Sequence, residues 1–194
     1  MDLQQVAPGL WRWTAAHPDW EPRQEQDDPA DWDPEVGCVA YATDDALVLI
    51  DPLVANGSYE ALDKLAEGKK EVGILTTIQW HGRSGAELAK RYSATTTPPD
   101  GVEPVEIEGA AETMFWIPKH GALVAGDRLL GDRPPGLRIC PPSWLRYLGG
   151  FTQDDLRDEL RAQLLDLPIE MVLVSHGEPA LRDGRAAVER ALAQ

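Results

Sequence analysis

The sequence has few cysteines, few basic residues and no long apolar run. Its two cysteines, Cys38 and Cys140, lack C-x-x-C spacing, so we expect reduced thiols rather than a disulfide or a zinc knuckle. No run approaches the roughly 18 apolar residues of a membrane span, and the first residues lack the pattern of a signal peptide. These absences argue against a membrane protein, and we expect a cytoplasmic one.

Basic residues are outnumbered by acidic ones, 18 against 33, which gives a formal net charge of -15. A surface of this sign repels phosphate backbones, so nucleic acid is not an expected partner. The remaining composition, 43% hydrophobic and 26% charged residues, is typical of a soluble globular protein. A chain of 194 residues is within the size of one folding unit, so we predict a single domain over residues 1–194.

Short β-branched runs predict strands, and apolar residues three or four apart predict helices. The expected strands are 6–13, 37–43, 46–50, 72–77, 104–107, 113–117, 122–125 and 169–174. The expected helices are 58–67, capped by Ser58, then 86–92, then a helix from Thr152 to about 167, and 184–192. The segments 15–34 and 131–150, rich in proline or glycine, are expected to be loops. This order of elements predicts an α/β protein.

Three segments resemble landmarks of the metallo-β-lactamase superfamily, and they occur in the family's order. They are AlaLeuValLeuIleAspPro at 46–52, HisGlyAlaLeuValAlaGlyAspArgLeu at 120–129 and MetValLeuValSerHisGly at 171–177. The resemblance places Asp51 at the end of an early strand, Asp127 at the end of a hairpin, and His176 after a late strand. It extends over most of the chain and implies an α/β fold with a four-layer αββα sandwich.

The family's signature, His-x-His-x-Asp-His, is largely replaced. After the strand that ends near residue 76, the chain reads ThrIleGlnTrpHisGly at 77–82. Thr77 and Gln79 therefore stand where two histidines would be, His81 replaces the aspartate, and Gly82 replaces the third histidine. The family's middle histidine would fall near residues 109–113, where Glu112 is the nearest substitute.

The resemblance then implies at most one metal ion. The first metal position has lost its three histidines, whereas His81, Asp127 and His176 can form the second, with Glu112 as a further ligand. Two imidazoles and a carboxylate suit zinc, iron or manganese. We therefore expect a divergent hydrolase-like protein that acts on a small molecule, with Asp127 and His81 as its catalytic residues. The family hydrolyses lactams, thioesters, phosphoesters and lactones, and nothing in this sequence selects among them.

Each of these residues also has an ordinary structural interpretation. His81 can bond a neighbouring carbonyl, Asp127 suits a turn, His176 can be tied to backbone at a strand end, and Glu112 can be solvated. The alternative hypothesis is a metal-free protein on the same fold that binds a small ligand or has a structural role. In that case the seven tryptophans would supply interface patches for a homo-oligomer.

Arginine and histidine residues near these positions allow two further interpretations. Arg83 and Arg128 could neutralise the carboxylates and form a metal-free pseudo-site, or both could be surface residues, the more so Arg128. His17 lies in a segment that could overhang the site, with Trp20 and Trp32 as apolar walls. The ordinary alternative for that segment is a surface loop.

Overall fold

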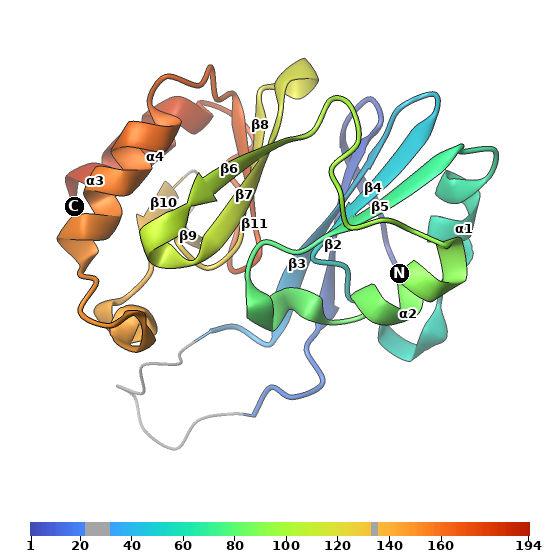
Figure 1. Cartoon of the computed structure of the whole chain (residues 1–194), viewed down its shortest axis with the longest axis horizontal. Helices are drawn as coiled ribbons and strands as arrows, with labels where there is room; N and C mark the ends of the chain where they lie inside the picture. The colour runs from blue at the N-terminus through green and yellow to red at the C-terminus, as the bar shows by residue number, and fades with distance from the viewer. Residues whose placement is uncertain (22–31, 133–135) are drawn as a thin grey trace.

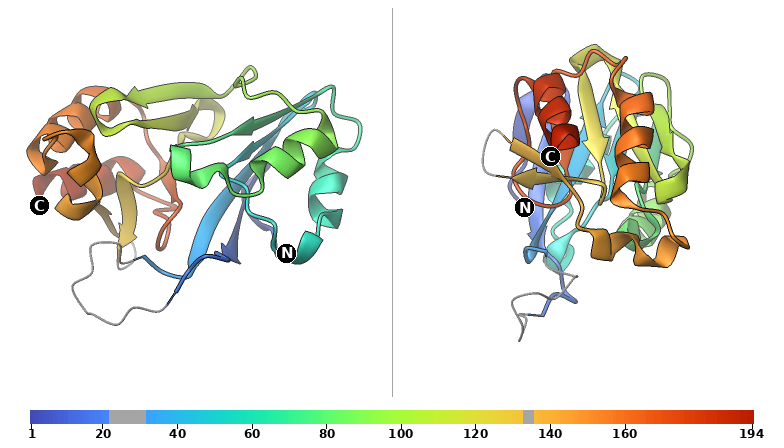
Figure 2. Two further views of the ribbon diagram at one scale, coloured as in Figure 1. Left: turned by 60° about the horizontal axis from the view of Figure 1, so that its bottom comes forward. Right: turned by 90° about the vertical axis from the view of Figure 1, so that its left-hand side faces the viewer.

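Two β-sheets lie face to face in the middle of the molecule, and a pair of helices covers the outer side of each (Figure 1). The computed structural model describes residues 1–21, 32–132 and 136–194. Figure 2 shows the same layers from two further directions. The order helix, sheet, sheet, helix confirms the α/β four-layer αββα sandwich that the sequence resemblance implied.

The first sheet has the strand order β1-β2-β3-β4-β5, antiparallel except for the parallel pair β4 and β5. Its strands are β1 (Gln4–Ala7), β2 (Leu10–Ala16), β3 (Glu35–Ala42), β4 (Ala46–Ile50) and β5 (Glu71–Leu75), and its helices are α1 (Glu60–Ala66) and α2 (Gly85–Tyr92). The predicted hairpin of 37–50 is present. The predicted strand 6–13 is instead a hairpin that turns at Pro8 and Gly9, because Gly9, with φ 77°, allows the reversal.

The second sheet has the strand order β11-β8-β7-β6, with β11 parallel to β8. Its strands are β6 (Glu103–Ile107), β7 (Glu112–Ile117), β8 (Ala122–Ala125) and β11 (Met171–Val174), and its helices are α3 (Gln153–Leu164) and α4 (Gly184–Ala193). A separate two-stranded sheet pairs β9 (Leu129–Asp132) with β10 (Gly136–Ile139). Within the described residues, no helix has the length and hydropathy that a bilayer span needs.

Several predicted bounds, and one predicted cap, differ from the structure; for example, the strand predicted at 72–77 ends at Leu75 and that predicted at 169–174 begins at Met171. The segment 131–150, expected to be loop, contains the end of β9, all of β10 and a 3-10 helical segment, η5 (Pro142–Leu148). Ser58 does not cap α1, since that helix begins at Glu60 after Tyr59 and has no side-chain cap. Helix α3 ends at Leu164 rather than near 167, although it begins as expected after Thr152. Part of the predicted loop 15–34, residues 22–31, lies outside the described residues.

Apolar side chains alternate along the central strands and supply three buried layers. On β4, Val48 and Ile50 pack between the two sheets, whereas Leu47 and Leu49 face the helical side. On β8, Val124 lies in the layer between the sheets, and Leu123 faces the side of α3 and α4. Strands buried on both faces are continuously apolar, as these two are. Burial of each such side chain contributes roughly 1.5–3 kcal/mol.

The two parallel strand pairs bring four chain segments to one edge of the sandwich. β4 and β5 end in the same direction, and so do β8 and β11. The residues that follow these four strands include Asp51, His81, Asp127 and His176. Loops at the carboxyl ends of parallel strands commonly carry function because a rigid sheet holds them in place.

Candidate metal centre

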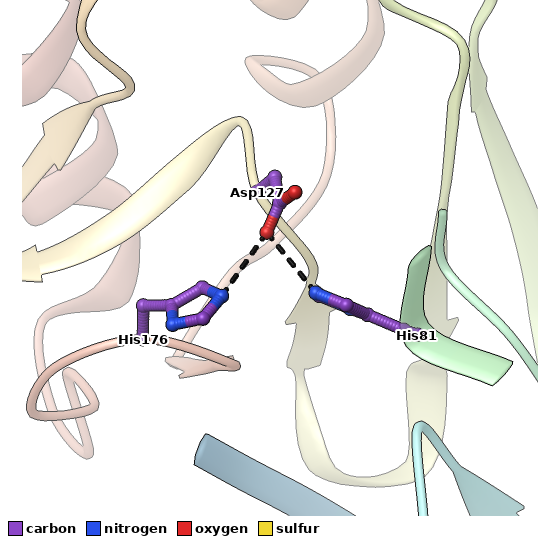
Figure 3. Close-up of side chains that lie close together, drawn as sticks. All are labelled: His81, Asp127 and His176. Atoms are coloured by element: carbon purple, nitrogen blue, oxygen red, sulfur yellow. Dashed lines mark ion pairs between the residues drawn. The ribbon is translucent and has the colours of Figure 1, made fainter. Parts of the chain in front are cut away.

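Three of the residues predicted from the sequence meet at this edge of the sandwich (Figure 3). His81 is buried in the 3-10 segment η2 (Gln79–Gly82) after β5, Asp127 lies in the turn after β8, and His176 follows β11. One ligand atom from each lies within 4.8 Å of the others. His81 therefore comes from the first half of the chain, and its two partners come from the second half.

The carboxylate of Asp127 lies between the two imidazoles. Its Oδ1 atom is 3.1 Å from Nε2 of His81 and 3.2 Å from Nε2 of His176. Neither contact has hydrogen-bond geometry, and this buried oxygen has no hydrogen-bond partner among the described residues. A buried acceptor without a partner is costly, so it requires an explanation. A cation bound by these three residues would satisfy the oxygen, so they offer a donor set that could hold a metal ion.

Asp51 determines how the His81 ring is oriented. Its Oδ2 atom is 2.8 Å from Nδ1 of His81 and also accepts hydrogen bonds from the hydroxyls of Thr77 and Ser175. Its Oδ1 atom accepts from the backbone N–H of Thr77 at 2.8 Å. Because a carboxylate only accepts, Nδ1 of His81 carries a proton toward Asp51, and Nε2 faces Asp127. Metal-binding histidines commonly have such a carboxylate partner.

The electrostatics of the cluster follow from burial and from opposite charges in contact. Burial opposes the charged form of His81, but Asp51 and Asp127 on either side outweigh it and raise its pKa to about 9. Burial likewise opposes ionisation of both carboxyls, but the adjacent imidazoles hold the pKa of Asp51 and of Asp127 below its usual range. Both carboxylates are therefore ionised at neutral pH, and His81 carries a proton on each ring nitrogen. A metal ion bound at Nε2 of His81 would displace the proton from that nitrogen.

Glu112 is not brought into this cluster. It begins β7, is 2% exposed, and accepts hydrogen bonds from the backbone N–H groups of Gly126, Asp127 and Arg128 at 2.7–3.0 Å. Burial raises its pKa to about 7, although Arg128 opposes this. The oxygens of Glu112 hold the turn that carries Asp127. Glu112 is therefore not a fourth ligand in this geometry, and it is not the solvated side chain of the ordinary interpretation either.

Thr77 and Gln79, which replace the family's first two histidines, do not form a second group of metal-binding atoms. The Thr77 hydroxyl bonds Asp51, and Gln79 is exposed to solvent. Among the described residues, the cluster of His81, Asp127 and His176 is the one group with donor atoms placed for a metal.

Neither arginine forms an ion pair with a carboxylate of the described residues, although the charge of Arg83 helps to hold the pKa of Asp51 below its usual range. Arg83 donates from Nη1 to the backbone oxygens of Gly37 and Asp51, each at 2.9 Å. Arg128 donates to the Ala110 carbonyl and to the Tyr147 hydroxyl. The expectation that Arg128 is a surface residue is wrong, since it is 1% exposed.

A cavity of about 550 Å³ opens over the cluster. His17 and Trp32 line it, as the overhang hypothesis required, and Trp32 packs edge-on against His176 with ring centroids 5.6 Å apart. Trp20 is not in the lining; its indole N–H donates to the Trp32 carbonyl at 2.9 Å.

Sequence reasoning missed further lining residues. They are Val36, Trp80, Ser143, Trp144, Arg146 and Tyr147. Four of them lie in η5, within the segment that was predicted to be loop. Trp144 and Tyr147, two aromatic residues within the seven residues of η5, were a signal that this segment could line a binding cavity.

Comparison of the sequence finds no matching family model and no curated protein of significant similarity. Solved structures are similar over nearly the whole chain. The DIM-1 metallo-β-lactamase matches with a TM-score of 0.62 at 12% identity, covering 99% of this chain and 94% of that one. A metallo-β-lactamase from Erythrobacter litoralis matches with a TM-score of 0.57 at 14% identity, covering 98% and 90%.

A metallo-β-lactamase family protein from Thermus thermophilus also matches, with a TM-score of 0.53 at 17% identity, covering 97% of this chain and 80% of that one. Identities this low establish the architecture and nothing about activity. The order of the layers, the sheet topology and these structural matches together show that the chain has the metallo-β-lactamase fold.

Proposed function

We propose that this chain is a hydrolase-like protein that binds one divalent metal ion, zinc, iron or manganese, through His81, Asp127 and His176. Its substrate would be a small molecule bound in the cavity above them. The observation that carries the proposal is the convergence of three ligand atoms around the partnerless Oδ1 atom of Asp127. The structures of similar fold include proteins described as metallo-β-lactamases, which supports a hydrolytic role.

Three protein ligands leave a coordination position open, and a metal in such a site lowers the pKa of bound water to about 7 and polarises the scissile group. The chain's own residues prepare the site for this chemistry. Asp51 keeps the proton on Nδ1 of His81, and Glu112 fixes the turn of Asp127. Trp32 and Trp144 pack edge-on against His176 and shield it from solvent.

The proposal is tested by thermal unfolding with and without added zinc, manganese or iron(II). We expect metal to raise the melting temperature of the wild-type chain but not that of His176→Ala or Asp127→Asn. The matched control is His120→Gln, since His120 lies at the other end of β8, beside Tyr41. Gln79→Ala is a second control, because Gln79 is exposed and outside the cluster.

Stabilisation by metal in the two ligand variants, or loss of stabilisation in the controls, would place the metal elsewhere. Absence of metal binding in the wild-type chain would favour the alternative proposal, a metal-free protein that binds a small ligand. That alternative is supported by Thr77 and Gln79, which stand where the resemblance expects histidines and offer no imidazole to a metal.

A further inference from the structure

The charge of the cavity is opposite to the charge of the chain. The chain carries a formal net charge of -15, yet the charged residues that line the cavity, apart from its histidines, are three arginines, Arg83, Arg128 and Arg146, and one carboxylate, Asp127. None of the three arginines forms an ion pair with a carboxylate within the described ranges. A cationic wall in an acidic protein concentrates anions at that wall.

Arg83 is fixed in place but leaves part of its guanidinium unused. Only Nη1 donates hydrogen bonds, to the carbonyls of Gly37 and Asp51 and to the sulfur of Cys38. Nε is shielded from solvent and has no acceptor, and Nη2 forms no hydrogen bond with the described residues. A guanidinium anchored through one nitrogen can present the N–H groups of its other terminal nitrogen, here Nη2, to an anion.

The backbone of Arg83 supports a role in binding. Its φ of 35° and ψ of -119° lie in a region that favours glycine. Side chains held in such conformations cluster at ligand-binding and active sites, where the surrounding structure maintains the strain. Arg83 adjoins η2, the segment that carries His81, and it lines the same cavity as the proposed metal ligands.

Flat aromatic side chains form much of the remaining wall. Trp80 and Tyr147 are 58% and 47% exposed and pack edge to face, with ring centroids 5.7 Å apart. Trp80 comes from η2 and Tyr147 from η5, so the pair spans the two halves of the chain. Exposed aromatic faces beside a cavity offer apolar area to a flat ligand.

We propose that the cavity binds a small organic anion with a flat apolar body. Its anionic group lies against Arg83 and Arg146, and its apolar body lies against the aromatic residues. The inference rests on the proposed function, since it assigns a substrate class to the same cavity. The preference of the cavity for a flat anion, however, comes from side chains that are not the proposed metal ligands. It can therefore be measured in the absence of metal.

The test compares 2-naphthoate with its neutral analogue 2-naphthamide, titrated into the protein in EDTA and followed by calorimetry. Chelation prevents the carboxylate from binding a metal, so any preference for the anion comes from the protein. We expect naphthoate to bind about ten-fold more tightly than naphthamide, because hydrogen bonds to charged groups are the stronger ones. Arg83→Gln and Arg146→Gln should each weaken naphthoate binding and leave naphthamide binding unchanged.

Arg185→Gln is the matched control, because Arg185 lies on α4, paired with Glu189 and outside the cavity lining. If Arg83→Gln does not fold, the exposed Arg146 still provides the comparison. Equal affinity for the two probes, or binding of neither, would overturn the inference. Because metal is absent, these outcomes are independent of the metal-binding test of the proposed function.

Discussion

Asp51 occupies a left-handed backbone conformation, with φ 49°, at the end of β4, and its carboxylate is buried beside His81. Aspartate tolerates this conformation better than most residues with a side chain. The turn it makes allows one carboxylate to accept from Thr77, Ser175 and His81 together. Single residues outside the three proposed ligands thus decide where those ligands point.

Asp51→Asn tests this role of the carboxylate. The amide is similar in size but cannot hold the Nδ1 proton of His81 as a carboxylate does, so we expect metal affinity to fall about 10–100-fold. Competition with a fluorescent chelator measures the change. The control is Asp63→Asn, since Asp63 is a surface carboxylate paired with Arg91. Unchanged affinity in Asp51→Asn would show that Asp51 does not orient a metal ligand.

Gly126 is a second residue on which the site depends. A Cβ atom there would lie 2.4 Å from the Thr77 hydroxyl and 3.1 Å from Oε2 of Glu112. We expect Gly126→Ala to destabilise the fold by about 1–3 kcal/mol, as overpacking of a core does, and to weaken metal binding. Urea unfolding and metal titration measure the two effects. Gly82→Ala is the stability control, because no other atom lies within 4 Å of its Cβ position. Equal stability of the two variants would show that Gly126 is not needed for close packing of this turn.

At the scale of elements, helix α3 depends on its first turn. The Thr152 hydroxyl accepts from the backbone N–H of Asp155, whose carboxylate accepts from the backbone N–H of Thr152. We expect Thr152→Ala to lower the free energy of unfolding by about 1 kcal/mol and leave metal affinity unchanged. Since α3 lies on the far side of the second sheet from the first, a change in metal affinity would show that the site depends on more than its local loops.

The central strands could be predicted from the sequence because their apolar runs are long enough to carry their own signal. Strands β4 and β8 are buried on both faces, so every residue is apolar. Strands β9 and β10 have four residues each and include glycine, so local sequence indicated a loop. They form because Leu137 and Ile139 of β10 pack into the core with α4, a contact that only the folded chain provides.

The candidate site was predictable where the family resemblance added to the strand pattern. Asp127 and His176 come two residues after β8 and β11, and the order of the family's landmarks indicated that they belong to one site. The burial of Glu112 and Arg128 was not predictable, because glutamate and arginine are mostly exposed. Both are buried by backbone partners contributed by distant segments, the amides of residues 126–128 for Glu112 and the Ala110 carbonyl for Arg128.

At the scale of the whole molecule, the proposed metal links the two halves of the sandwich. His81 follows a strand of the first sheet, whereas Asp127 and His176 follow strands of the second. A metal that binds these three residues binds only the folded chain, so it stabilises the fold by mass action. A free metal concentration 100-fold above Kd would add about 2.7 kcal/mol to the free energy of unfolding.

The most direct measurement of the central claim is the number of metal ions per chain. Protein purified without chelator is dialysed against buffer containing micromolar zinc, and its zinc content is determined by elemental analysis. The cluster of His81, Asp127 and His176 predicts one zinc ion per chain. A content near zero would contradict the metal centre, and a content of two would contradict the loss of the first metal position.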